Sequence, residues 1–364
     1  MRSIIYIILF CGAIQGAFLS VVIAFRNHGN KTANKIMSLF LLLFSFSIAL
    51  HALGHKGYLV FLPDHELIIT ILIFAYNPLL YLYTIIQTGK KEILTSRELF
   101  HFIPVALISI FISYIFPASK GRIHIAAHSS LKQVSEIISV LLLPQYLIYF
   151  SLIIKEIVVY MKLVKESYSS TSKISLQWIS LLLGLNTITW IFAFIISLIF
   201  PKDELAWDYV WIFVSVYMYL IGYFALNQDQ TAKVDRNLIS DKYKSSNLKA
   251  DKADEIYTIL VNSMQKEKIY LTEDLTLASL AHELDCTIHH LSQVINDKFD
   301  MNFSEYINRQ RIEESKILIA EKDNPKTIAD IAFYVGFNSL SSFNSAFKKF
   351  TSETPTQFKN KHSS

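Results

Sequence analysis

The first 226 residues alternate long apolar runs with short polar connections. A run of about 20 apolar residues is long enough to cross a bilayer as a helix. The pattern therefore predicts seven membrane-spanning helices, over Ile4–Phe25, Ile36–Leu53, Leu67–Gln87, Phe100–Phe116, Ile137–Tyr160, Ile179–Phe200 and Trp207–Leu226. Because Arg2 precedes the first run, a cleaved signal peptide is the alternative for that run. Polar residues inside the runs, such as His51 and Gln145, are expected to form interhelical hydrogen bonds or to line a ligand pocket.

A different pattern begins at Asn227, where the long apolar runs end. Residues 227–252 are polar and charged with no apolar period, which is typical of a linker. Residues 253–364 carry shorter stretches in which apolar residues recur at helical spacing. The first such helix has Asp251 as its expected cap.

Two similar patterns follow in tandem, over Leu275–Ile295 and Thr327–Phe347. In each, an apolar helix with a central alanine leads to a turn position, Asp285 or Gly336, and then to a second apolar helix. The turn needs a left-handed backbone, which Gly tolerates best and Asp less well. This order predicts two helix-turn-helix units. The fold class is therefore all-α, a polytopic membrane helix bundle followed by a tandem helix-turn-helix domain.

The second helix of each unit has an apolar inner face and a polar outer face. Base edges in the DNA major groove offer donors and acceptors, so a reading helix needs such a face. The outward residues of the first helix are His289, His290, Ser292 and Gln293. Those of the second are Ser339, which is also a candidate cap, with Leu340, Ser341, Asn344 and Ser345, followed by Lys348 and Lys349 for phosphates. An ordinary solvated helix face is the alternative for both.

A single helix is predicted between the units, from about Asn302 to Glu321, with Asn302 and Glu305 as a capping box. At ~1.5 Å per residue it spans about 28 Å, close to one DNA turn of ~34 Å. Such a spacer would place two reading helices in successive major grooves. Arg309 and Arg311 lie on this helix and are expected to form a structural salt bridge or to contact phosphate.

The C-terminal pattern resembles the DNA-binding domain of the AraC/XylS family of bacterial transcription regulators. The residues that carry the resemblance are Asn302-Phe303, Tyr306-Ile307-Asn308-Arg309, Ile312, Gly336-Phe337-Asn338-Ser339, Phe343, Phe347-Lys348-Lys349 and Thr354-Pro355. The resemblance implies recognition of adjacent major grooves by a monomer or dimer. Asp285, Asp300 and Ser352 stand where the family often has Gly, and Ser345 stands where a base-contacting Arg is common. We therefore expect the first reading helix to discriminate bases better than the second.

Two shorter motifs extend the resemblance to the apolar part of the chain. Pro78-Leu79-Leu80-Tyr81-Leu82-Tyr83 and His101-Phe102-Ile103-Pro104 are similar to the membrane domain that is fused to some AraC-type regulators.

Charge supports a membrane orientation but adds little to DNA binding. Basic residues gather in alternate connections, around Arg26, Lys90 and Lys162. Basic connections face the cytoplasm, so we expect a protein of the bacterial inner membrane with its N-terminus outside the cell membrane and its C-terminal domain in the cytoplasm. Residues before Asn227 hold 16 Lys and Arg against 10 Asp and Glu, and the remainder hold 18 against 20. DNA binding therefore has no support from net charge.

The sequence gives no pattern that predicts disulfide bonding, metal binding or catalysis. The cysteines, Cys11 and Cys286, are expected in different environments, so no disulfide is predicted. We find no metal-ligand spacing, phosphate loop or nucleophile elbow, so neither an enzyme nor a cofactor is expected.

These patterns together predict a membrane-embedded one-component transcription regulator. Its expected partners are double-stranded promoter DNA, the lipid bilayer, a small-molecule or membrane-derived ligand, and a second copy in a homodimer. The alternatives are a membrane transporter or membrane enzyme with a regulatory helical tail, and a tail that binds another protein.

Overall fold

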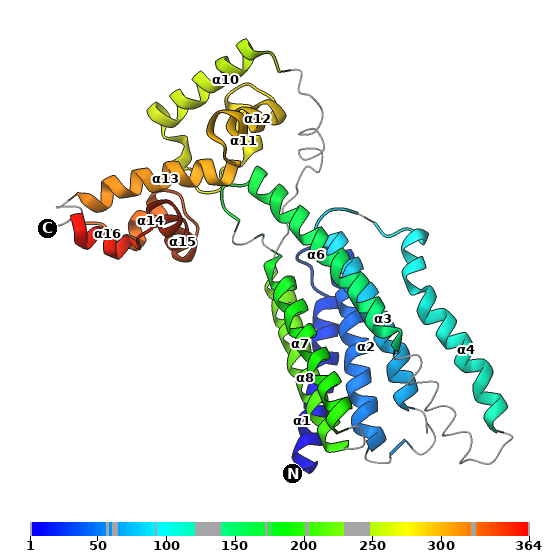
Figure 1. Ribbon diagram of the computed structural model, residues 1–364. Helices are drawn as coiled ribbons and strands as arrows, with labels where there is room; N and C mark the ends of the chain where they lie inside the picture. The colour runs from blue at the N-terminus through cyan, green and yellow to red at the C-terminus, as the bar shows by residue number, and fades with distance from the viewer. Residues whose placement is uncertain are drawn as a thin grey trace. The chain divides into compact units, whose positions relative to one another are not determined.

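A computed structural model describes residues 2–55, 58–59, 65–91, 93–120, 140–171, 174, 176–200, 204–228, 248–321 and 325–362. All the regular secondary-structure elements within these ranges are helices. The β-structure within these ranges is one isolated antiparallel bridge between Tyr168 and Thr276. The chain divides into two compact units (Figure 1). Unit 1 holds residues 1–158 and 176–231, and unit 2 holds residues 159–175 and 232–364.

Unit 1 is a set of long apolar helices. They are α1 (Arg2–Ala24), α2 (Lys31–His55), α3 (His65–Gln87), the 3-10 helix η1 (Ser96–Phe102), α4 (Ile103–Lys120), the first part of α6 (Leu142–Ser167), α7 (Gln177–Ile199) and α8 (Glu204–Asn227). Helices α1, α2 and α8 pack against one another, α3 packs on α2, and α7 packs on α8.

Five of these helices are long and apolar enough to cross a membrane, over Ser3–Ala24, Lys31–Gly54, His65–Gln87, Gln177–Ile199 and Leu205–Asn227. Helix α6 carries Lys155 and Glu156 within its length, which lowers its apolar character. Helix α4 is 18 residues long, and the start of the expected span at Ile137 lies outside the described residues. The count of seven spans therefore stays a prediction.

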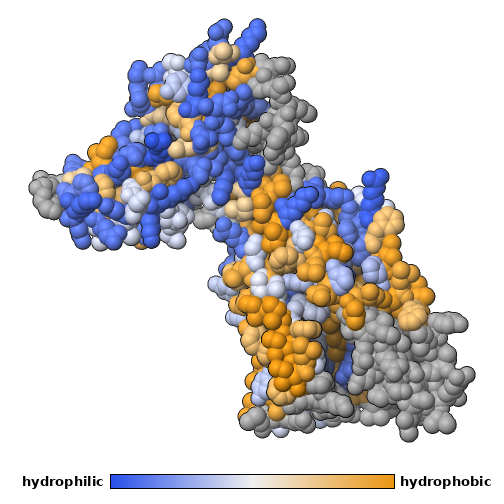
Figure 2. Space-filling model, in the orientation of Figure 1, coloured by the Kyte–Doolittle hydropathy of each residue, from blue (hydrophilic) through white to orange (hydrophobic). Residues whose placement is uncertain are grey.

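Large apolar side chains on these helices point away from the packed interior (Figure 2). On α7, Phe194 is 62% exposed and Leu198 is 66% exposed. Exposed apolar surface of this extent on a helix of spanning length is what a lipid-facing helix requires.

Polar residues inside unit 1 join one helix to another. The His51 ring Nε2 lies 3.1 Å from a carboxylate oxygen of Asp208, and both side chains are buried. The Gln145 amide donates to the Phe74 carbonyl at 2.8 Å. These contacts agree with the expectation of interhelical hydrogen bonding. Gln87, by contrast, donates to Tyr83 within its own helix.

Unit 2 contains shorter amphipathic helices around two hydrophobic cores. Its elements are α10 (Ala250–Asn262), the π-helical turn η2 (Ser263–Glu267), the 3-10 turn η3 (Ile269–Leu271), α11 (Leu277–Glu283), α12 (Ile288–Phe299), α13 (Phe303–Ala320), α14 (Ile328–Tyr334), α15 (Leu340–Thr351) and α16 (Pro355–His362). One core joins α10, α11 and α12 to the start of α13, and the other joins α14 and α15 to its later part (Figure 1).

The start of unit 2 differs from the sequence expectation. Asp251 does not cap α10, because the helix begins at Ala250 with Lys249 in the capping position, so that prediction was wrong. Of the expected linker 227–252, residues 229–247 lie outside the described residues.

Candidate DNA interface

Both turns have the left-handed backbone that their geometry requires. The φ angle is +50° at Asp285 and +95° at Gly336. Asp300 and Ser352, which also replace Gly of the AraC-type pattern, have φ angles of +52° and +64° and end α12 and α15. These residues therefore keep the backbone of a Gly turn and bear some conformational strain for it.

Short polar side chains start each helix of the two helix-turn-helix units. Thr276, Thr287, Thr327 and Ser339 accept hydrogen bonds from backbone N–H groups at the helix starts. Each such cap stabilises a helix by about 1 kcal/mol. Ser339 therefore serves as the cap of α15 and has this structural role whether or not it meets DNA.

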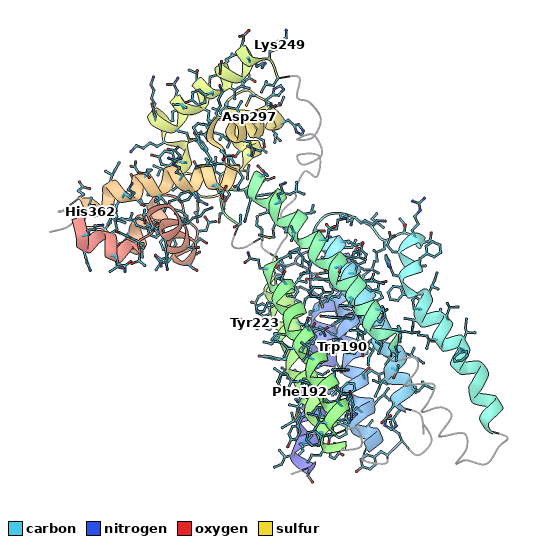
Figure 3. All side chains as sticks on the ribbon, viewed as in Figure 1. Trp190, Phe192, Tyr223, Lys249, Asp297 and His362 are labelled. Carbon is cyan, nitrogen blue, oxygen red and sulfur yellow. The ribbon has the colours of Figure 1, made fainter. Side chains whose placement is uncertain are left out.

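The outer face of α12 carries the residues expected to read bases. His289 is exposed, and His290, Ser292 and Gln293 are half-buried, while Leu291, Val294 and Ile295 are buried. The Gln293 amide donates to the Asp297 carboxylate at 3.2 Å, one helical turn away. Asp297 lies on the same helix (Figure 3). This bond uses one of the two N–H donors of the Gln293 amide, so the other N–H and the carbonyl oxygen are available to a base.

The outer face of α15 is made of smaller polar residues. Ser341, Asn344, Ser345 and Lys348 are exposed, and Leu340 is 39% exposed. Lys349 forms an ion pair with Glu305 of α13 at 2.5 Å. Burial raises the pKa of Glu305, but hydrogen bonds from Lys349 and Asn302 bring it below its ordinary value. Lys349 thus joins α15 to α13 and has less freedom to contact phosphate than Lys348.

A buried arginine, whose role the sequence pattern did not reveal, holds the two helix-turn-helix units together. Arg311 is fully buried and forms no salt bridge of the expected kind among the described residues. Its Nε donates to the Tyr270 carbonyl at 2.7 Å, and one terminal nitrogen donates to the Thr272 carbonyl at 2.7 Å. Burial lowers the pKa of Arg311 to about 10, which leaves it charged at neutral pH.

Gly336 is needed beside this arginine for a second reason besides its φ angle. A Cβ atom there would lie 2.8 Å from the Leu271 carbonyl oxygen and 3.0 Å from Arg311 Nε. The turn of the second helix-turn-helix unit therefore closes directly on the arginine that binds the loop before α11. Arg309, by contrast, is exposed.

An open hollow of about 500 Å³ lies beside the first turn. It is lined by Lys252, Ala281, His282, Asp285, Cys286, Thr287 and His290. Burial raises the pKa of the Cys286 thiol, so this lining cysteine stays protonated at neutral pH. The hollow exposes the start of α12, where backbone N–H groups favour an anion.

These features define a tandem helix-turn-helix domain built on one connecting helix, the class found in DNA-binding regulators. Residues 280–361 match the sequence model described as "Helix-turn-helix domain". Relatives include an "Uncharacterized HTH-type transcriptional regulator" of Staphylococcus aureus strain MSSA476, 35% identical over 92 residues, which is 25% of this chain and 12% of the relative. The "Bifunctional transcriptional activator/DNA repair enzyme AdaA" of Bacillus subtilis strain 168 is 33% identical over 88 residues, 24% of this chain and 41% of that protein.

A solved structure also shows similarity to part of the chain. It is the C-terminal domain of AraT, a response regulator from Geobacillus stearothermophilus, with 26% identity, a TM-score of 0.26, and coverage of 32% of this chain and 88% of that one. The sequence matches show an AraC-type helix-turn-helix domain at the C-terminal end of the chain, which confirms the resemblance drawn from the residues. The matched region is a quarter of the chain, and it spans only 12% of the Staphylococcus relative.

Proposed function

We propose that this protein is a membrane-embedded one-component transcription regulator that binds promoter DNA through α12 and α15. The observation that carries the proposal is the attachment of both helix-turn-helix units to α13. This helix is 18 residues long, and at ~1.5 Å per residue it extends about 27 Å. One DNA turn is ~34 Å, so two reading helices joined by such a spacer suit successive major grooves.

The reading residues are assigned by their exposure and chemistry. On α12, His289, His290 and Gln293 offer donors and acceptors for purine edges, with Ser292 beside them. On α15, Leu340, Ser341, Asn344 and Ser345 form a less selective face, and Lys348 contacts phosphate. The first helix-turn-helix unit supplies most of the base discrimination and the second mainly positions the protein.

The apolar helices of unit 1 anchor the protein in the inner membrane of a bacterium. Five helices of spanning length, with exposed apolar side chains such as Phe194, support this location. The basic connections near Arg26 and Lys90 support a cytoplasmic C-terminal domain and an outer N-terminus. A small-molecule or membrane-derived ligand binds unit 1 and controls the protein. A second copy of the chain is a further partner, in a homodimer.

The decisive experiment is mapping of the DNA occupied by the full-length protein in cells, combined with transcript levels. Wild type should enrich a defined motif near genes whose transcripts change on deletion. His289→Ala and Gln293→Ala should each weaken binding to that motif by ~1–3 kcal/mol. Thr356→Ala on the exposed surface of α16 is the control and should leave occupancy unchanged. Wild-type occupancy without any common motif would overturn the assignment.

Topology is tested separately with reporter fusions after Leu226. A cytoplasmic reporter should be active there and a periplasmic reporter inactive, while a fusion before the first apolar helix should show the reverse. Activity of the periplasmic reporter after Leu226 would contradict the proposed orientation.

A further inference from the structure

Residues 159–175 form part of the DNA-binding unit, although in sequence they lie between two helices of the apolar part. Helix α6 runs without interruption from Leu142 to Ser167, and its residues from Val159 onward group with unit 2. The chain returns to unit 1 at Leu176. The structure describes residues 159–171 and 174 of this stretch, and we call them the docked segment. Its position in the chain means that one apolar helix continues directly into the DNA-binding unit.

The docked segment pairs with the backbone at the start of the first helix-turn-helix unit. Tyr168 and Thr276 form an antiparallel bridge. The Ser169 N–H donates to the Leu275 carbonyl at 3.1 Å, and its hydroxyl donates to the same carbonyl at 2.7 Å. Thr276 is the cap of α11, so this pairing fixes the point where the first helix-turn-helix unit begins.

Ser169 also contacts the helix that joins the two helix-turn-helix units. Its carbonyl accepts a hydrogen bond from the Ser304 hydroxyl at 3.2 Å and from the Asn308 amide at 3.4 Å. Its hydroxyl accepts from a terminal nitrogen of Arg311 at 3.4 Å. Ser169 is 2% exposed, so all these bonds form away from water.

These contacts place Ser169 in the same buried network as the loop before α11 and the turn at Gly336. Arg311 binds the carbonyls of Tyr270, Thr272 and, at 3.3 Å, Glu273, all of which precede α11. The same guanidinium packs against Gly336 of the second helix-turn-helix unit. Loss of Ser169 would remove both donors of the Leu275 carbonyl, while Arg311 would keep its bonds to the Thr272 and Glu273 carbonyls. A buried network tolerates such an unpaired carbonyl poorly.

The rest of the docked segment has its own ties within unit 2. The Tyr160 hydroxyl donates to the Ile174 carbonyl at 3.0 Å, which closes the segment on itself. The Asn296 amide of α12 donates to the Glu166 carboxylate at 3.5 Å. Lys165 is one of the charges that lower the pKa of Glu305. The segment therefore contacts or influences both α12 and the start of α13.

We propose that the docked segment couples the apolar helix α6 to DNA binding by fixing the spacing of the two reading helices. When Ser169 is docked, α11 and α13 are held together and α12 and α15 keep the separation that two successive grooves require. When movement of α6 withdraws Ser169, the start of α11 loses its hydrogen-bonded tie to α13, the first helix-turn-helix unit shifts on α13, and the two units bind two-part DNA sites weakly. This inference rests on the proposed function and adds the route by which the membrane part regulates it.

The test uses the full-length protein in lipid nanodiscs and a random-sequence duplex DNA library as the probe. Wild type should enrich two-part sites whose halves lie about one helical turn apart. Ser169→Pro removes the N–H donor to Leu275 and the bridge between Tyr168 and Thr276. Its affinity for two-part sites should fall by on the order of 10-fold or more, because binding of the first half-site no longer holds α15 close to the second half-site. Its affinity for the first half-site alone should stay unchanged, which also shows that the first helix-turn-helix unit is folded. Thr171→Pro, which introduces the same residue two positions later in the docked segment, is the matched control and should behave as wild type.

A second variant prevents undocking and guards against a simple folding defect. Tyr168→Cys with Thr276→Cys, made in a chain with Cys11→Ser and Cys286→Ser, places two thiols across the bridge. The oxidised form should bind two-part sites more tightly than the reduced form of the same variant, which lacks the Thr276 cap of α11 equally. Equal two-part affinity of Ser169→Pro and wild type would refute the coupling, as would an oxidised form that binds like Ser169→Pro. No enrichment of any motif by wild type would instead reject the proposed function.

Discussion

Gly336→Ala provides a quantitative test of the second turn. The φ angle of +95° is unfavourable for any residue with a Cβ, and a left-handed backbone costs roughly 1–2 kcal/mol for such a residue. The new Cβ would also lie 2.8 Å from the Leu271 oxygen, so Leu271 or Arg311 has to move. Displacement of Arg311 weakens a buried hydrogen bond to a charged group, which is worth about 1.5–3 kcal/mol. The expected loss of stability is about 2.5–5 kcal/mol.

The corresponding position of the first helix-turn-helix unit supplies the control with the opposite sign. Asp285 already has a φ angle of +50°, so Asp285→Gly relieves strain and should be neutral or stabilising by up to ~1 kcal/mol. Hydrogen exchange of the full-length protein in nanodiscs, followed at α14 and α15 and at α11 and α12, measures the two helix-turn-helix units separately. Unchanged exchange at α14 and α15 in Gly336→Ala would refute the argument that the turn needs Gly.

Arg311, Ser345 and Asp330 each provide a separate test. Arg311→Met leaves the carbonyls of Tyr270 and Thr272 without donors and should destabilise the domain by about 3 kcal/mol, measured by hydrogen exchange. Unchanged exchange would mean that Arg311 acts only as a surface charge. Ser345→Ala should weaken DNA binding by less than ~0.5 kcal/mol in a titration with the enriched motif, against ~1–3 for His289→Ala; equal losses would contradict the stronger role of α12. Hydrogen bonds from the Thr327 side chain and backbone lower the pKa of Asp330, so its stabilising contribution is present above its ordinary pKa of 3.8 and is lost as pH falls below it. The acid-induced unfolding of Asp330→Asn should lack that component, and an identical acid transition would exclude the cap.

Local sequence patterns determined most helices of the C-terminal domain and several of their limits, although the cap expected at Asp251 was wrong. Asn302 with Glu305 and Thr327 with Asp330 form capping boxes at the starts of α13 and α14, because each cap joins residues three apart and needs no distant partner. The amphipathic spacing of α12 likewise determined which of its faces is buried. The AraC-type resemblance followed from these short-range features, and the sequence matches confirm it.

The apolar part was less completely determined. Length and apolarity identify α1, α2, α3, α7 and α8 as helices of spanning length. They do not decide the same for α4, which is only 18 residues long. Nor do they decide it for α6, because a helix with interior charges such as Lys155 and Glu156 can continue out of a membrane as well as cross it. The membrane location and the number of spans remain predictions.

The tertiary structure alone decided how distant residues meet. Arg311 was expected to form a salt bridge or to contact phosphate, but it is buried against the carbonyls of Tyr270 and Thr272, about 40 residues earlier in the chain. Ser169 reaches Leu275, although more than 100 residues separate them. No periodicity signals such contacts, since a polar side chain is buried only where packing brings it a partner. The left-handed turns could be read from the sequence, whereas the network that closes around Gly336 depends on the packing of α13 and of a segment that follows an apolar helix.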